Sequence, residues 1–174
     1  GMVMAKASTL FEIMSKDKVD PDEMMFHMNN DLYQTKTAGM FVTCILGEYD
    51  LVSEEIRWVN AGHQPALIRT QDGKYSEYTS SSTPLGVIKH KDKSVYKLER
   101  TKLSSSRFYI FTDGLSESLD KNGDEIGVEG SIKIIENNFN NDLKKQLKDV
   151  TSEVVKVAGE KNLSDDLTLV GLGN

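Results

Sequence analysis

Residues 107–117 read RFYIFTDGLSE, an apolar run that ends in an acidic turn. The apolar part predicts a buried strand, and Asp113 follows it where the strand opens into a loop. The pair Asp165-Asp166 stands in a similar place, directly before the closing apolar run at residues 167–172. Because a strand end holds a carboxylate rigidly at the edge of a core, these two acidic segments predict one shared site in space.

The residue types at this site suit a divalent metal ion. Mg²⁺ and Mn²⁺ are hard cations that prefer carboxylate and water oxygens, so Asp113, Asp165 and Asp166 are candidate ligands. Gly114, which has no side chain, would let the backbone approach a metal-bound water or a phosphate. The alternative stays open at this point, because Asp-Gly pairs commonly form turns and Asp-Asp pairs commonly lie in solvated loops.

Composition limits the class of protein. The 174 residues, with 38% hydrophobic and 28% charged side chains, predict a single globular domain over residues 1–174. The net charge of -6 and the pI near 5.1 argue against binding to nucleic acid or to an anionic membrane. No stretch approaches the roughly 20 apolar residues of a membrane span. The single cysteine, Cys44, is interpreted as a small core residue, and together these features favour a cytoplasmic protein.

Hydrophobic periodicity predicts an α+β protein. Apolar spacing of three and four residues predicts helices at 3–14, 21–32, 128–135 and 143–157. Asp20 is the expected N-cap of the second helix, with Pro21 at its first position. Apolar runs between turn signals predict strands at 40–46, 56–61, 65–69, 75–78, 95–98, 107–111 and 167–172. Short connections favour antiparallel sheets covered by the helices, and the continuous apolar run at 40–46 favours a central strand.

One histidine is a candidate for chemistry. His63 ends a predicted strand at the corner Asn60-Ala61-Gly62-His63. It can orient a phosphate or donate a proton, or it can cap the corner through a backbone hydrogen bond; the second interpretation is favoured. The other two histidines, His27 and His90, are interpreted as structural or solvated.

Six segments occur in the order in which they stand in a known family. They are residues 40–43 (MFVT), 58–65 (WVNAGHQP), 84–87 (PLGV), 111–117 (FTDGLSE), 122–127 (NGDEIG) and 164–169 (SDDLTL). The chain therefore resembles the stage II sporulation E type of PPM (protein phosphatase 2C-like) serine/threonine phosphatases.

The resemblance implies an α-β-β-α sandwich of two antiparallel sheets between helices. It also implies hydrolysis of phosphoserine or phosphothreonine on a protein by water that two Mn²⁺ or Mg²⁺ ions activate, with no catalytic side chain beyond that water. By position, Asp113 with Gly114, and Asp165 with Asp166, match metal-binding residues of the family. The corner residues Asn60, Gly62 and His63 match a segment near the site.

The sequence departs from the family at its start. The family carries a Gly-Asp-Val-x-Gly-[His/Lys]-Gly segment, whose aspartate touches both metals, just before its first helix. This sequence begins at that helix, and the strands that precede the segment in the family do not appear. The expectation is a fragment with an incomplete metal site and impaired activity, and with an exposed sheet edge that makes a homodimer plausible.

The resemblance also suggests partners and a regulatory element. The expected substrate is a phosphorylated bacterial signalling protein, such as an anti-sigma factor antagonist. The first two helices of the family act as a switch, and the methionine-rich residues 3–34 are expected to do so here. The alternative is a degenerate phosphatase-like module that binds a signalling partner without hydrolysis, and a metal-binding segment before residue 1 would decide against it.

Overall fold

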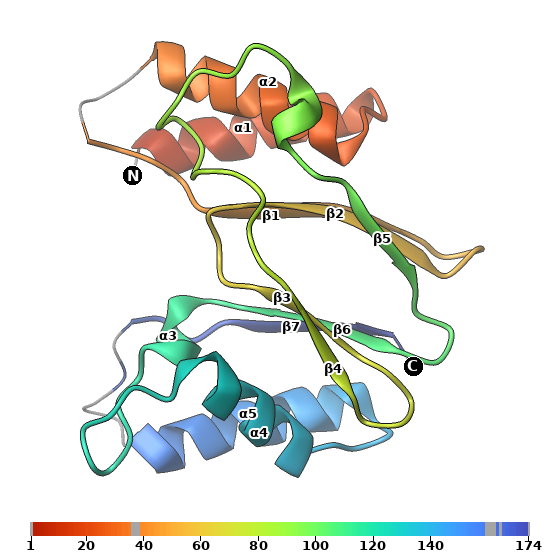
Figure 1. Cartoon of the computed structure of the whole chain (residues 1–174), viewed down its shortest axis with the longest axis vertical. Helices are drawn as coiled ribbons and strands as arrows, with labels where there is room; N and C mark the ends of the chain where they lie inside the picture. Colours follow the sequence, from red (N-terminus) through yellow and green to blue (C-terminus); the bar gives the residue numbers. More distant parts are fainter. Residues whose placement is uncertain (1, 36–38, 159–162, 164, 174) are drawn as a thin grey trace. The chain divides into compact units, whose positions relative to one another are not determined.

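The computed structural model describes residues 2–35, 39–158, 163 and 165–173. The chain forms two compact units (Figure 1): the first unit contains residues 1–63 and 79–102, and the second contains residues 64–78 and 103–174. Each unit has one antiparallel sheet and its own helices, which confirms the predicted α+β class of two antiparallel sheets with flanking helices. One domain over residues 1–174 stays a prediction. Within the described ranges, no helix is long and apolar enough to cross a bilayer.

The first unit has a three-stranded sheet with the strand order β1-β2-β5. Its elements are α1 (Met2–Lys16), α2 (Pro21–Gln34), β1 (Cys44–Asp50), β2 (Glu55–Ala61), a 3-10 helix η1 (Lys93–Val95) and β5 (Glu99–Lys102). The helices α1 and α2 cover one face of this sheet (Figure 1). The apolar face of α2 carries three methionines with at most 4% of their surface exposed, so methionine is the main filler between helix and sheet. The buried core residues of this unit are Ala7, Met24, Met25, Met28, Leu32, Val42, Leu46, Val59, Ala61, Leu85 and Tyr96.

The second unit has a four-stranded sheet with the order β4-β3-β6-β7. Its strands are β3 (Ala66–Arg69), β4 (Tyr75–Tyr78), β6 (Arg107–Phe111) and β7 (Leu169–Gly173). Its helices are α3 (Asp113–Ser116), α4 (Gly127–Asn137) and α5 (Leu143–Ala158). The apolar faces of α4 and α5 pack on the sheet, because the three-and-four spacing of their valines and isoleucines points one side of each helix inward. The buried core residues are Leu67, Tyr109, Phe111, Leu115, Ile134, Ile135, Val150 and Val154.

Two strand predictions for the first unit are wrong. The strand predicted at residues 40–46 begins only at Cys44 and is an edge strand rather than a central one. Met40 and Phe41 are about half exposed, and Val42 forms a single bridge to Leu85. Residues 95–98 form the end of η1 and an extended segment, and the strand follows at β5. Only some residues of the apolar run at 40–46 are packed against the rest of the unit. An apolar run of this kind looks the same in the sequence as a fully buried central strand.

Other local predictions hold with changes in detail. Cys44 is half-buried, and burial raises the pKa of its thiol to about 11, which agrees with a packing role. Asp20 precedes α2 as predicted, but its carboxylate does not cap the helix and instead pairs with Arg57 at 3.0 Å. The Asp-Gly sequence at residues 72–73 forms the turn that joins β3 to β4, with Gly73 at a φ of 81°.

Candidate functional site

The two acidic segments meet through their backbones in the second unit. Phe111, the last residue of β6, pairs with Leu169 at the start of β7. Beyond this pair, Thr112 N–H donates to the carbonyl of Thr168 at 3.1 Å. The hydroxyl of Thr112 donates to the carbonyl of Asp166 at 2.9 Å and accepts from Thr168 N–H at 3.0 Å. The predicted juxtaposition of Asp113 with the acidic pair is therefore present in the backbone, and Thr112 holds it.

Gly114 lies where no other residue fits without a shift of the backbone. A Cβ at this position would stand 2.5 Å from the carbonyl oxygen of Asp166 and 2.8 Å from that of Asp165. Both atoms belong to the main chain, so they have little freedom to move away. The glycine therefore permits the close approach of α3 to the acidic pair, which is a structural reason for the Asp-Gly sequence.

The three predicted carboxylates face solvent. Asp113, Asp165 and Asp166 are all exposed. One oxygen of Asp113 accepts from Gly114 N–H at 2.9 Å, and one oxygen of Asp165 accepts from Asp166 N–H at 2.8 Å. Each of these two carboxylates keeps a second oxygen that these bonds do not use, so the donor types fit a hard cation.

The arrangement, however, is not a complete metal cage. In the part of the chain that the structure describes, no three His, Cys, Asp or Glu side chains converge on one point that could hold a metal ion. The three aspartates thus offer the right oxygen chemistry, and their backbones are adjacent, but the metal-binding role of Asp113, Gly114, Asp165 and Asp166 stays a prediction.

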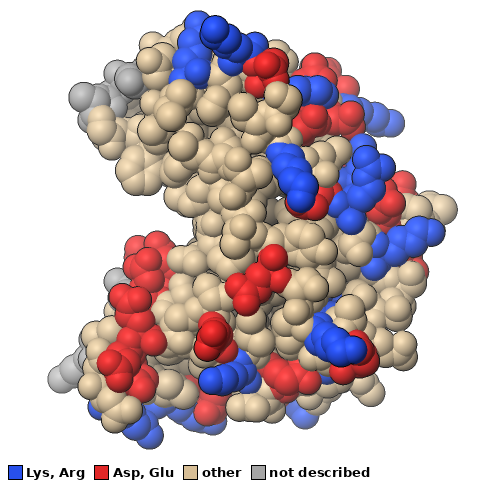
Figure 2. All heavy atoms as spheres, viewed as in Figure 1, with Lys and Arg blue, Asp and Glu red and all other residues tan. Residues whose placement is uncertain are grey.

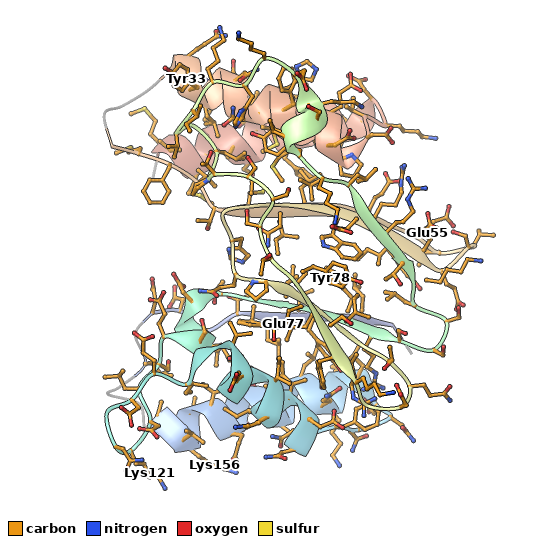
Figure 3. The ribbon with its side chains drawn as sticks, viewed as in Figure 1. Tyr33, Glu55, Glu77, Tyr78, Lys121 and Lys156 are labelled. Atoms are coloured by element: carbon orange, nitrogen blue, oxygen red, sulfur yellow. The ribbon has the colours of Figure 1, made fainter. Side chains whose placement is uncertain are left out.

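Acidic side chains extend beyond the predicted ligands. Figure 2 shows them gathered over α3 and the turn that follows it. Between residues 113 and 125 there are five acidic residues and one basic residue, Lys121, which lies exposed on that turn (Figure 3). Backbone N–H groups of Asp124 and Asn122 donate to Asp120 and hold the pKa of its carboxyl below the usual value. This surface carries a negative field that attracts cations.

The predicted corner at residues 60–63 lies in the first unit and is built by Asn60 rather than by His63. The side chain of Asn60 accepts from His63 N–H at 3.0 Å and donates to the carbonyl of His63 at 3.3 Å. Gly62 has a φ of 70°, and a Cβ there would collide with the ring of Pro84. The imidazole Nδ1 of His63 lies 3.2 Å from the hydroxyl of Thr43. Hydrogen bonds and the glycine conformation thus define the shape of the corner. Its nearness to the metal site stays a prediction.

Sequence reasoning missed two groups of positioning residues. One is Thr112, whose signal in the sequence is a hydroxyl just before a candidate ligand. The amide of Asn29 donates to the carbonyl of Ile88 at 2.9 Å and accepts from Gly86 N–H at 3.0 Å. Asn30 makes the same kind of paired contact with the backbone of His90. The signal was an Asn-Asn pair inside a predicted helix, where asparagine is unfavourable unless its amide has a specific partner.

Comparison with known proteins agrees with this fold. The sequence profile described as Stage II sporulation protein E (SpoIIE) matches residues 1–173. The phosphoserine phosphatase RsbU of Bacillus subtilis (strain 168) is 21% identical over 172 residues, which cover 98% of this chain and 50% of that protein. The phosphoserine phosphatase RsbP of the same organism is 27% identical over 95 residues, or 55% of this chain and 23% of that protein. The chain thus spans half or less of the length of these curated relatives.

Solved structures show the same fold. The SiaA-PP2C domain of Pseudomonas aeruginosa superposes with a TM-score of 0.79 at 15% identity, covering 99% of this chain and 67% of that one. A structure of the PP2C phosphatase domain with a regulatory fragment of SpoIIE from Bacillus subtilis gives a TM-score of 0.79 at 19% identity, covering 98% and 49%. With the family profile matched over nearly every residue and the PP2C fold shared, this chain belongs to the PPM-type SpoIIE family.

Proposed function

We propose that this chain is the phosphatase domain of a bacterial signalling protein and removes phosphate from phosphoserine or phosphothreonine on a partner protein. The observation that carries this proposal is the junction of β6, α3 and β7, where Thr112 and Gly114 bring Asp113 next to the backbone of Asp165 and Asp166. The names of the relatives RsbU and RsbP, both phosphoserine phosphatases, support the reaction class. The compartment we expect is the cytoplasm.

The residues of the site would hold and orient the reactants. Asp113, Asp165 and Asp166 would bind Mn²⁺ or Mg²⁺ through carboxylate oxygens, and Gly114 would leave room for water or phosphate beside them. When bound, two such ions would activate water for in-line attack and neutralise the phosphate. Because no three carboxylates converge within the described residues, we expect this chain on its own to bind metal weakly and to hydrolyse slowly.

The test is metal-dependent hydrolysis of a phosphoprotein. Release of phosphate from a serine-phosphorylated anti-sigma factor antagonist is measured with Mn²⁺, with Mg²⁺ and with chelator, for this chain and for the native full-length protein. We expect Asp113→Asn to lower the native protein's rate by at least about 100-fold, because a lost metal ligand removes charge stabilisation in the transition state. Asp149→Asn, on α5 in the same unit, is the matched control. Full activity of Asp113→Asn would refute the assignment.

A second readout separates metal binding from catalysis. Mn²⁺ binding is followed by electron paramagnetic resonance of free Mn²⁺ during titration. The Asp113→Asn, Asp165→Asn and Asp166→Asn variants are each expected to weaken binding, whereas Asp149→Asn is not. Unchanged affinity in all three variants would move the metal site elsewhere.

The incomplete cage also favours a second candidate function, a module that binds a signalling partner without hydrolysis. This alternative would be selected if the native protein bound the phosphorylated partner but released no phosphate with any metal.

A homodimer is a further proposal. The seven-residue strand β1 lies at the edge of its sheet in the described structure and offers backbone groups for pairing with a second copy. Light scattering after gel filtration tests it, and a monomer at high concentration would exclude it.

A further inference from the structure

A polar pocket opens in the second unit at the first residue of β6, whereas Asp113 follows the last residue of that strand. Its volume is about 300 Å³. It is lined by Arg69, Thr70, Gln71, Ser104, Ser105, Ser106, Arg107, Phe139 and Asn141. These described lining residues comprise two arginines, hydroxyls and amides, and no aspartate or glutamate. The described lining thus carries two positive charges together with neutral side chains that can donate hydrogen bonds.

Both arginines are buried in the second unit and do not lie on its surface. Arg69 is 8% exposed and Arg107 is 3% exposed. Arg69 donates to the two carboxylate oxygens of Glu136 at 2.6 and 2.9 Å and to the carbonyl of Thr70 at 3.2 Å. The guanidinium beside Glu136 holds the pKa of that carboxyl below its usual value. Glu136 therefore stays ionised at neutral pH and balances the charge of Arg69.

The second guanidinium is held by oxygens of the α4–α5 connection and of α5. Arg107 donates to the side-chain oxygen of Gln146 at 2.6 Å and to the carbonyls of Asn140 and Asn141 at 2.5 and 2.8 Å. These contacts fix the guanidinium in place at the wall of the pocket. A charged group with a fixed position is preorganised for a ligand, because binding then orders little side-chain motion.

Phe139 brings the two cations close to one another. The Cζ atom of Arg69 lies 3.7 Å from the centre of its ring, and the Cζ atom of Arg107 lies 4.8 Å from it. Two guanidinium groups at one ring repel each other, and the ring offsets only part of that repulsion. An anion in the pocket would lower this repulsion further.

The rim adds neutral donors and no net negative charge. Ser104 and Ser105 are exposed, and Ser106 is half-buried, so their hydroxyls can turn toward a ligand. A shallower hollow lined partly by Asp72 adjoins the pocket through Thr70, Gln71, Ser105 and Ser106. Asp72 pairs with Lys74 at 2.6 Å and accepts from the hydroxyl of Thr70, so its charge is balanced locally.

We propose that this pocket binds a tetrahedral oxyanion of the phosphate class. The positive charges of the two guanidinium groups attract an oxyanion, and hydroxyls from the β5–β6 connection can donate hydrogen bonds to it on the open side. The site lies apart from the acidic junction and needs neither metal nor catalysis. Its ligand is either free phosphate or the phosphoryl group of a phosphorylated peptide.

The test is calorimetric titration of this chain with inorganic phosphate in the presence of chelator. Acetate and chloride at matched ionic strength are the comparison anions, and a phosphoserine peptide is the second arm. Saturable binding of phosphate, with weaker binding of acetate and none of chloride, is the expected result. Tighter binding of the peptide identifies a phosphorylated segment as the occupant, and equal or weaker binding identifies free phosphate. Equal heats for phosphate and chloride would overturn the proposal.

Charge variants at the exposed Ser105 test the location without disturbing the core. Ser105→Asp should weaken phosphate binding about tenfold, since a negative charge several ångströms from the anion repels it, and Ser105→Lys should strengthen it. Ser152→Asp, an exposed position on α5, is the control and should leave the affinity unchanged. Identical affinities for the three variants would overturn the assignment to this pocket. These titrations contain chelator and measure binding only. A negative result therefore leaves the phosphatase proposal, which is tested by metal-dependent hydrolysis, unaffected.

Discussion

The helices of the two units differ in how fully they are packed on their own sheets. In the second unit, α4 and α5 bury Ile135, Val150 and Val154 completely. In the first unit, α2 is anchored by its methionines, but α1 buries only Ala7. Four large apolar side chains of α1 are 46–80% exposed: Met2, Met4, Phe11 and Ile13. A helix with so little burial contributes little to the stability of its unit, and we infer that α1 can move or repack at low cost. This agrees with the expected switch role of residues 3–34, which stays a prediction.

The largest expected effect tests this contrast with one residue type. Ile135→Ala should destabilise the protein by about 3 kcal/mol, because it leaves a cavity in a closed core. Ile13→Ala should change stability by less than about 0.5 kcal/mol, because the side chain is 56% exposed. Urea unfolding followed by circular dichroism measures both values. Similar losses for the two variants would show that α1 is as firmly packed as α4, and the contrast would be wrong.

The next effect concerns the junction of α3 and β7. Gly114→Ala should cost about 2 kcal/mol, because the new Cβ meets two main-chain oxygens and forces the acidic segments apart. It should also weaken Mn²⁺ binding, which titration measures independently of stability. The control is Ser116→Ala in the same short helix, which removes a buried hydroxyl without a hydrogen-bond partner in the described structure and should be neutral or stabilising. Unchanged stability in Gly114→Ala would mean that the backbone of the junction can shift at little cost in free energy.

The sequence predicted the second unit better than the first for a physical reason. The helices near 128–135 and 143–157 each bury one continuous face, so their periodicity is strong. The strand at 107–111 is buried at four of its five positions and therefore appears in the sequence as an apolar run. Residues 40–46 pack through a few positions only, and Val42 is fixed by a single bridge to Leu85, a contact between distant residues that no local pattern encodes. In the site, the acidic residues were visible in the sequence. The contacts of Thr112 and Asn29 were not, because hydrogen bonds across 54 and 57 residues depend on the assembled fold.

A smaller effect is expected at the contact between α2 and the loop at residues 86–90. Asn29 is completely buried, and its amide satisfies one donor and one acceptor of that loop. Asn29→Ala should cost about 1–3 kcal/mol, because the buried N–H of Gly86 and the carbonyl of Ile88 lose their partner. Asn137→Ala, at an exposed position of α4, should cost far less. If Asn29→Ala matched that control in urea unfolding, the loop would be held by its apolar contacts alone and α2 would not position it.

The smallest expected effect is a pH dependence confined to the second unit. The folded-state pKa of Glu136 is lowered, chiefly by its hydrogen bonds with Arg69. A lowered carboxyl pKa adds stability that is present above the unfolded-state pKa, near 4.3, and is lost as the pH falls through the folded-state value. The stability difference between wild type and Glu136→Gln should therefore be constant above about pH 5 and shrink below it.

Its size should stay under about 1 kcal/mol, since the Glu136 side chain is 40% exposed and solvent screens the pair. Urea unfolding between pH 3 and 7 measures the difference, with a repeat in 1 M NaCl as the control. High salt should reduce the difference by screening, because the exposed side of the pair is open to ions. A stability difference that grew toward low pH would show that folding raises the pKa of Glu136 instead of lowering it. It would mean that Glu136 is held in its protonated form and leaves the positive charge of Arg69 unbalanced, which would make the pocket beside it a stronger anion site than the one proposed.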